Sequence, residues 1–150
     1  MNIQKTINEL GRNAKAVTQS MRLLSTKKKN NALRILSKNI QTFSNEILDA
    51  NKKDIENAKT NSLSSPLINR LTLTPQSIEE LVKSIEIIET LPDPIGKILE
   101  EWTQPNGLKF QKISVPLGVI AVIYESRPNV TVDAACIAMK SGNAVILRGG

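Results

Sequence analysis

Two short, continuous apolar runs constrain the fold of this chain more than any other feature of its sequence. They are Val119–Tyr124 and Ala144–Leu147, and neither alternates with polar residues. Such runs are typical of strands that are covered on both faces, as in parallel sheets. Residues 130–140 between them have the apolar content of a short, largely buried helix, which we expect Ser141–Asn143 to end. The sequence therefore predicts a β-α-β unit.

The first ninety residues are predicted to be mostly helical. Apolar side chains recur at intervals of three and four residues in three segments: Ile3–Leu24, Leu33–Ala50 and Ile78–Leu91. We expect the first helix to pack its apolar stripe on its own domain and Asn51 to interrupt the second. Thr74-Pro75 is a typical helix start, with a capping hydroxyl followed by proline.

A β-hairpin is predicted between the helices and the β-α-β unit. Ile98–Thr103 and Leu108–Val115 are two extended runs, and the Asn106-Gly107 pair between them favours a tight turn because both residues tolerate positive φ. The apolar side chains change face within the second run, which predicts either a bulge or a strand that passes between two environments.

Composition excludes several kinds of site. The chain has no His, so it cannot form a Ser-His or Cys-His catalytic pair or an imidazole metal site, and we expect no metal. Its one Cys cannot form an internal disulfide or a Cys-pair zinc site. The four aromatic residues (one Trp, one Tyr and two Phe) are too few for a surface that stacks single-stranded nucleic acid.

The net charge of +6 comes from the front of the chain. Residues 1–30 hold seven basic residues and one acidic residue, with Lys27, Lys28 and Lys29 in a row. Such a run is more often a solvated helix start than a nucleic-acid surface, so we expect no nucleic-acid partner. No stretch has the roughly 20 apolar residues of a membrane span, and residues 1–26 lack the apolar block of a signal peptide. We expect a cytoplasmic location and no membrane partner.

Candidate binding residues follow the two predicted strands, because ligands collect beyond the carboxyl ends of parallel strands. Arg127 and Arg148 can each hold a phosphate or carboxylate through paired hydrogen bonds. Gly149 and Gly150 let a ligand approach the backbone. A plain strand-ending turn is the alternative interpretation of Arg148–Gly150.

Two further residues invite a catalytic interpretation. The amide NH₂ of Asn129 can stabilise a developing oxyanion, whereas its amide oxygen can instead cap a helix that begins at Val130. Cys136 lies in the middle of a predicted buried helix and has no His to activate it. We interpret this thiol as structural, since buried cysteines usually behave as small apolar residues.

The last third of the chain resembles a known enzyme family. Residues 115–134 read VPLGVIAVIYESRPNVTVDA and residues 140–150 read KSGNAVILRGG. These segments, with Asn69–Thr74 and Leu91–Gly96, are similar to gamma-glutamyl phosphate reductases, or glutamate-5-semialdehyde dehydrogenases, of the aldehyde dehydrogenase superfamily. The resemblance implies an α/β fold: residues 1–97 as the helical N-terminal part of a cofactor domain, 98–115 as a hairpin arm of the oligomerisation type, and 116–150 as the first β-α-β of a Rossmann-like NADP-binding domain.

The resemblance also implies a reaction, the second step of proline biosynthesis. In this family NADPH reduces L-glutamyl 5-phosphate to L-glutamate 5-semialdehyde and phosphate is released, after a cysteine thiolate has formed a thioester with the substrate. By position, Asn129 matches the superfamily's oxyanion-stabilising Asn, and Arg148 falls near the adenine ribose and its phosphate. Arg127 is hypothesised to hold the phosphate or carboxylate of the substrate. The choice between NADPH and NADH stays open.

One departure limits what the chain can do. The family's catalytic Cys lies in a Ser-Thr-Cys-Asn-like segment that is absent here, and Cys136 does not occupy that position. We therefore expect these residues to be the N-terminal portion of the enzyme, inactive and unstable by themselves. Expected partners are a second copy, through the hairpin, and glutamate 5-kinase. The alternatives are a helical interaction or nucleic-acid-binding module and another acyl-phosphate or aldehyde dehydrogenase of the superfamily.

Overall fold

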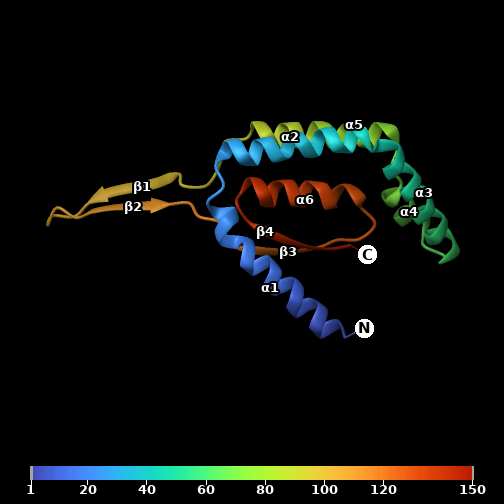
Figure 1. Cartoon of the computed structure of the whole chain (residues 1–150), viewed down its shortest axis with the longest axis horizontal. Coiled ribbons are helices and arrows are strands. Elements are labelled where there is room, and N and C mark those ends of the chain that lie inside the picture. The colour runs from blue at the N-terminus through green and yellow to red at the C-terminus, as the bar shows by residue number, and fades with distance from the viewer. Residues whose placement is uncertain (1, 150) are drawn as a thin grey trace.

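The computed structural model describes residues 2–149 and shows a mixed α/β arrangement of helices and two small sheets (Figure 1). The elements follow in the order α1 (Ile3–Arg22), α2 (Thr26–Thr42), α3 (Ser44–Thr60), α4 (Ser65–Leu71), α5 (Pro75–Thr90), β1 (Ile98–Thr103), β2 (Lys109–Ile113), β3 (Val119–Ile123), α6 (Pro128–Lys140) and β4 (Ala144–Arg148).

The predicted β-α-β unit is present. β3 and β4 pair in parallel from Val119 opposite Ala144 to Ile123 opposite Arg148, and α6 connects them. Gly142 follows the end of α6 with φ +70°, a left-handed conformation that favours glycine, and a Cβ there would come within 3.1 Å of Pro116. In Figure 1, α6 lies between the strand pair and the helices α2 and α5, while α1 crosses the opposite side of the strands.

The prediction that both strands are covered on both faces is wrong for β3. Ala144 in β4 is buried, but β3 alternates between exposed and half-buried residues, and Ile123 is 83% exposed. Val119, Ala121 and Ile123 share one face of β3 and are all exposed, so nothing within residues 2–149 covers that face. Pairing with β4 alone also leaves one edge of β3 open.

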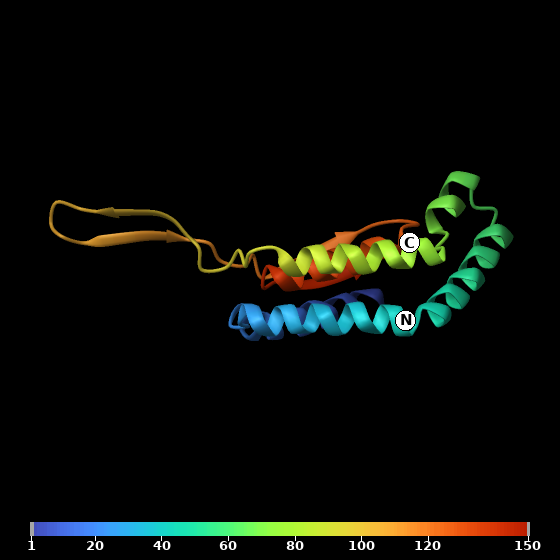
Figure 2. The same cartoon turned by 90° about the horizontal axis from the view of Figure 1, so that it is seen from above.

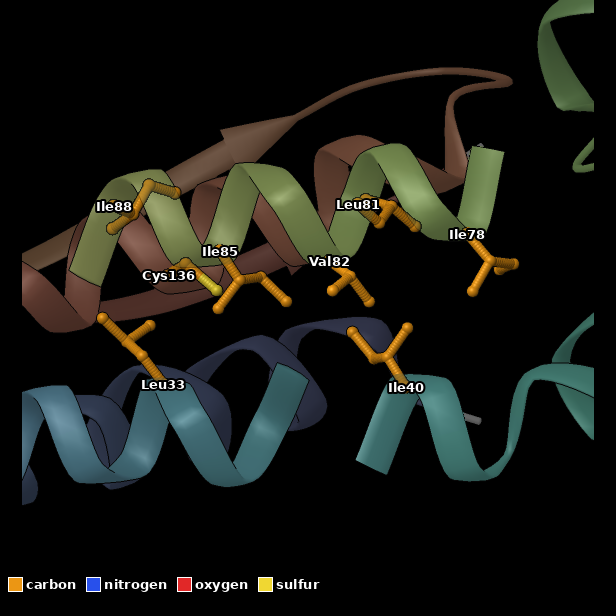
Figure 3. Packing of buried hydrophobic residues seen from close by; sticks show 8 residues of the cluster. All are labelled: Leu33, Ile40, Ile78, Leu81, Val82, Ile85, Ile88 and Cys136. Carbon is orange, nitrogen blue, oxygen red and sulfur yellow. The ribbon is translucent and has the colours of Figure 1, made fainter. Parts of the chain in front are cut away.

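Helices α2, α5 and α6 form the core, as Figure 3 shows. Leu33 from α2 is fully buried, and Ile85 from α5 and Cys136 from α6 are each 1% exposed. The buried cluster consists of Leu33, Ile40, Ile78, Leu81, Val82, Ile85, Ile88 and Cys136. The apolar stripes predicted for α2 and α5 are therefore the ones that meet.

The first helix departs from its prediction. Ile3 and Ile7 at the start of the stripe are 70% and 57% exposed, and no described residue of α1 is fully buried. The later part of the same stripe, from Ala14 to Met21, faces α6 and β4 across a shallow apolar cavity. Only this part of α1 packs on the domain, because its first turns project past the strands (Figure 1).

Asn51 does not interrupt a helix. The break lies at Phe43, and α3 runs through Asn51 without a gap. The Asn51 side chain is buried, and it binds the chain that follows α4: Nδ2 donates to the carbonyl of Leu71 at 2.9 Å and Oδ1 accepts from the N–H of Leu73 at 2.8 Å. These bonds to a distant segment satisfy the polar side chain, so the helix can continue. The predicted Thr74 cap is confirmed as a capping box with Ser77.

The hairpin is confirmed. β1 and β2 are antiparallel, with Trp102 opposite Phe110 and their rings stacked at 5.5 Å between centroids. The bulge lies between Ile98 and Glu100 in the first strand rather than in the second. Every residue of both strands is exposed, and the pair extends away from the helices as an arm (Figure 2).

A buried ion pair holds the root of this arm. Lys29 is 1% exposed, and its Nζ donates to both carboxylate oxygens of Asp93 at 3.0 and 2.9 Å. Burial raises the pKa of Asp93, but hydrogen bonds from the Ile95 N–H, Lys29 and Thr26 outweigh this effect, so the pKa lies below its usual value. The expectation of a solvated basic run is thus wrong for Lys29, although Lys27 and Lys28 are exposed.

A second buried lysine lies beside the first. Lys140 at the end of α6 is 3% exposed, and its Nζ donates to Asn30 Oδ1 at 2.7 Å and to the Glu89 carbonyl at 2.8 Å. Burial lowers the pKa of this ammonium group. Together the two lysines join α2, α5 and α6 at the end of the layer from which the arm leaves.

Candidate active site

The carboxyl ends of β3 and β4 meet at one edge, as the β-α-β prediction requires. The Tyr124 N–H donates to the Arg148 carbonyl at 3.1 Å, and the Tyr124 hydroxyl lies 2.5 Å from the Thr131 hydroxyl of α6. In the turn that follows β3, Ser126 has φ +49°. A left-handed conformation is uncommon for a non-glycine residue, and such residues gather at functional sites.

Asn129 lies in the first turn of α6. The helix begins at Pro128, and its N-cap residue, Arg127, makes no capping bond through its side chain. The prediction that Asn129 caps a helix beginning at Val130 is therefore wrong. Instead its Nδ2 donates to Asp133 Oδ2 at 3.4 Å, one helical turn further on. This bond is long, so the amide NH₂ is only weakly engaged.

Asn129 lines a cavity of about 280 Å³ between α4, α5 and α6. Arg70 and Glu80 reach it from α4 and α5, and Asp133 reaches it from α6. Ser84 Oγ donates to Asp133 Oδ1 at 2.8 Å and so holds this carboxylate. Sequence reasoning did not single out Arg70 as a site residue, although it lies within the Asn69–Thr74 segment on which the family resemblance partly rests.

Arg127 and Arg148 lie outside this cavity. Both side chains are exposed, and among residues 2–149 neither forms an ion pair with a carboxylate. A Cβ on Gly149 would lie 3.6 Å from the Tyr124 ring, which is an ordinary contact distance. Packing within the chain therefore does not require a glycine at this position. Gly150 lies outside the described residues. The structure therefore groups Asn129 with Arg70, and it leaves both predicted arginines open to solvent.

Cys136 is buried at 1% exposure, as its structural interpretation requires. Burial, and secondarily the charge of Asp133, raises the pKa of its thiol to about 11. A thiol of this kind carries almost no thiolate at neutral pH, and the thiolate is the nucleophile. Cys136 is thus unsuited to attack a substrate.

Residues 2–149 contain no group of three or more His, Cys, Asp or Glu side chains placed to hold a metal ion. No helix in this range combines the length and the apolar composition that crossing a membrane requires.

Comparison with known proteins gives a consistent result, although no family model matches the chain. It is 48% identical to gamma-glutamyl phosphate reductase from Francisella philomiragia, over 97% of this chain and 35% of the relative. It is 46% identical to the Clostridium novyi protein of the same name, over the whole chain and 36% of the relative.

Solved structures agree. Gamma-glutamyl phosphate reductase from Thermotoga maritima superposes with a TM-score of 0.91 at 37% identity, over 95% of this chain and 34% of that one. The Saccharomyces cerevisiae protein of that name gives 0.91 at 31% identity, over 95% and 36%. The chain is therefore a homologue of the N-terminal region of gamma-glutamyl phosphate reductase, and it spans about a third of the length of the relatives it matches.

Proposed function

We propose that this chain forms the N-terminal part of an NADPH-dependent enzyme that reduces L-glutamyl 5-phosphate to L-glutamate 5-semialdehyde and releases phosphate. The observation that carries the proposal is the similarity, over almost the whole chain, to proteins named for this reduction. The position of Asn129 also supports the proposal, because its amide is weakly engaged and lines an open cavity where a substrate can bind.

Asn129 has the role of oxyanion stabilisation. When the acyl carbon of the substrate is attacked, negative charge develops on the carbonyl oxygen, and an amide N–H aimed at that oxygen lowers the barrier. The Nδ2 atom can exchange its long, 3.4 Å bond with Asp133 for a shorter bond to this oxygen. Arg127, exposed in the turn before α6, is proposed to hold the phosphate of the substrate.

Arg148 is proposed to hold the cofactor. It ends β4 with an exposed guanidinium, which suits the phosphate of an NADP ribose, and ligands of parallel sheets bind beyond this end of the strands. Gly149 and Gly150 follow it in the proposed cofactor segment. The nicotinamide supplies the hydride when it is bound. We assign residues 116–150 to the first β-α-β of a Rossmann-like domain on the same grounds.

The attacking thiol is proposed to come from a residue outside these 150. The only thiol present, Cys136, is buried in the helical core with a pKa of about 11. The arm of β1 and β2 is proposed to make contacts between subunits, because it exposes Trp102 and Phe110 at its surface.

The test is the oxidation of L-glutamate 5-semialdehyde with phosphate and NADP⁺ by the full-length protein that carries these residues. Asn129→Ala should lower kcat by roughly 100- to 1,000-fold, as loss of an oxyanion donor does. Asn39→Ala, on the exposed surface of α2, is the matched control. The 150-residue chain alone should show no turnover. Full activity of Asn129→Ala, or turnover by the chain alone, would contradict the proposal.

A further inference from the structure

The cavity beside Asn129 brings together one cation and two anions from three different helices. Arg70 comes from the last turn of α4, Glu80 from α5 and Asp133 from α6. None of the three forms a salt bridge within residues 2–149. Glu80 accepts a hydrogen bond from Gln76, and Asp133 accepts from Ser84 and Asn129, but these donors are neutral. The charges of the carboxylates therefore remain available to a ligand that enters the cavity.

This charge pattern favours a zwitterion over a simple anion. A phosphate or a plain carboxylate would meet two carboxylates for each guanidinium, and like charges repel. An α-amino acid group carries a carboxylate, which a guanidinium binds through two parallel hydrogen bonds, and an ammonium, which carboxylates bind. One guanidinium near two carboxylates matches that group.

The dimensions agree with a short substrate. A volume of about 280 Å³ lies near the lower end of ligand pockets, which start at roughly 300 Å³. In a glutamyl group three carbon–carbon bonds separate the α-carbon from the acyl carbon, a span of about 4 Å. The acyl oxygen can thus reach Asn129 while the α-amino acid group stays within the same cavity.

We propose that this cavity is the subsite for the α-amino acid end of the substrate, in which Arg70 binds the α-carboxylate and Glu80 with Asp133 binds the α-ammonium. The assignment rests on the proposed function. It makes Arg70 a residue that determines specificity, because aldehydes without the α-carboxylate cannot use it.

Asn51 positions this subsite. Its two hydrogen bonds hold Leu71 and Leu73 on either side of the turn that follows Arg70. Because α4 has only seven residues, its end would otherwise be held by few contacts. The Arg70 backbone is thereby tied to α3, and its side chain starts from a defined point at the cavity wall.

The experiment compares L-glutamate 5-semialdehyde with butanal, which lacks both α-substituents, as substrates of the full-length protein with phosphate and NADP⁺. In Arg70→Ala the ratio of kcat/KM for the two aldehydes should fall by roughly 10- to 100-fold, the usual range for a hydrogen bond to a charged group. Arg70→Lys should restore part of the ratio, since lysine keeps the charge but not the paired donors. Lys83→Ala, exposed on α5 outside the cavity, should leave the ratio unchanged.

Two outcomes would overturn the subsite. If Arg70→Ala lowers kcat/KM equally for both aldehydes and raises the KM for phosphate, Arg70 binds the phosphate instead. If the ratio of kcat/KM is unchanged and the KM for phosphate is normal, Arg70 takes no part in recognition. Calorimetric titration of L-glutamate, which should bind more weakly to Arg70→Ala by the same factor, separates this inference from the proposed function. Glutamate binding through Arg70 without aldehyde oxidation would refute the function and support the subsite, whereas oxidation with an unchanged ratio would do the reverse.

Discussion

The helical layer of α2, α5 and α6 and the arm of β1 and β2 are held together by opposite means. The layer buries Leu33, Ile85 and Cys136 almost completely, together with the charged Lys29. The arm buries no residue of its strands, and these are joined by the backbone ladder, one aromatic stack and exposed side-chain bonds such as the ion pair of Lys112 with Glu100. Stability therefore resides in the layer, whereas the arm contributes mainly an exposed surface.

The largest expected effect is on the buried ion pair where the two regions meet. Lys29→Met keeps most of the side-chain volume but leaves the Asp93 carboxylate without its cation. Removing one partner of a buried pair costs about 3–5 kcal/mol, which urea denaturation followed by circular dichroism would measure. Lys28→Met, on an exposed neighbour, should change the free energy of unfolding by less than about 0.5 kcal/mol.

The same pair should respond to acid. The pKa of Asp93 is lower in the folded state than the usual 3.8, so its contribution to stability is complete above that value. It is lost as the pH falls through the folded-state pKa. Asp93→Asn should therefore flatten the fall in stability below pH 3.8. Equal stability of wild type and Lys29→Met at neutral pH would show that the layer does not depend on this pair.

An intermediate effect on the free energy of unfolding is expected at Asn51 in α3, the helix that follows α2 of the layer. Asn51→Ala leaves the Leu71 carbonyl and the Leu73 N–H without partners, which costs about 1–3 kcal/mol. Alanine is the better helix former by several tenths of a kcal/mol, so a purely local effect would stabilise the protein. Asn57→Ala, exposed on α3, measures that local gain. A more stable Asn51→Ala would refute the tertiary role of this side chain.

The smallest effect on stability is expected in the arm. Trp102 is 45% exposed and stacks on Phe110, which is itself 41% exposed, so Trp102→Ala should change the free energy of unfolding by less than about 1 kcal/mol. If the arm joins subunits, the same variant should weaken self-association in analytical ultracentrifugation. A loss of stability as large as that of Lys29→Met would mean that the arm belongs to the core, and the contrast between the two regions would be lost.

Much of the fold was predictable because local sequence patterns indicate the individual helices and strands. The stripe Ile78–Leu91 and the Thr74 cap predicted α5, the Asn106-Gly107 pair predicted the hairpin, and the two apolar runs predicted a parallel strand pair. The candidate site was only partly predictable. Asn129 was expected to stabilise an oxyanion or to cap a helix, and the start of α6 at Pro128 decided against the cap. Arg70 has no local pattern that marks it.

The sequence by itself determined most of the elements, the order in which they occur and the family, because periodicity, caps, turns and motifs are properties of neighbouring residues. It did not mark α4 or the break at Phe43. Tertiary structure alone decided which residues meet. Lys29 is buried although it stands in a basic run, and Asn51 continues a helix it was expected to break, because Asp93 and the Leu71–Leu73 segment lie beside them in space. Likewise, Arg70, Glu80 and Asp133 form one cavity only because α4, α5 and α6 pack together.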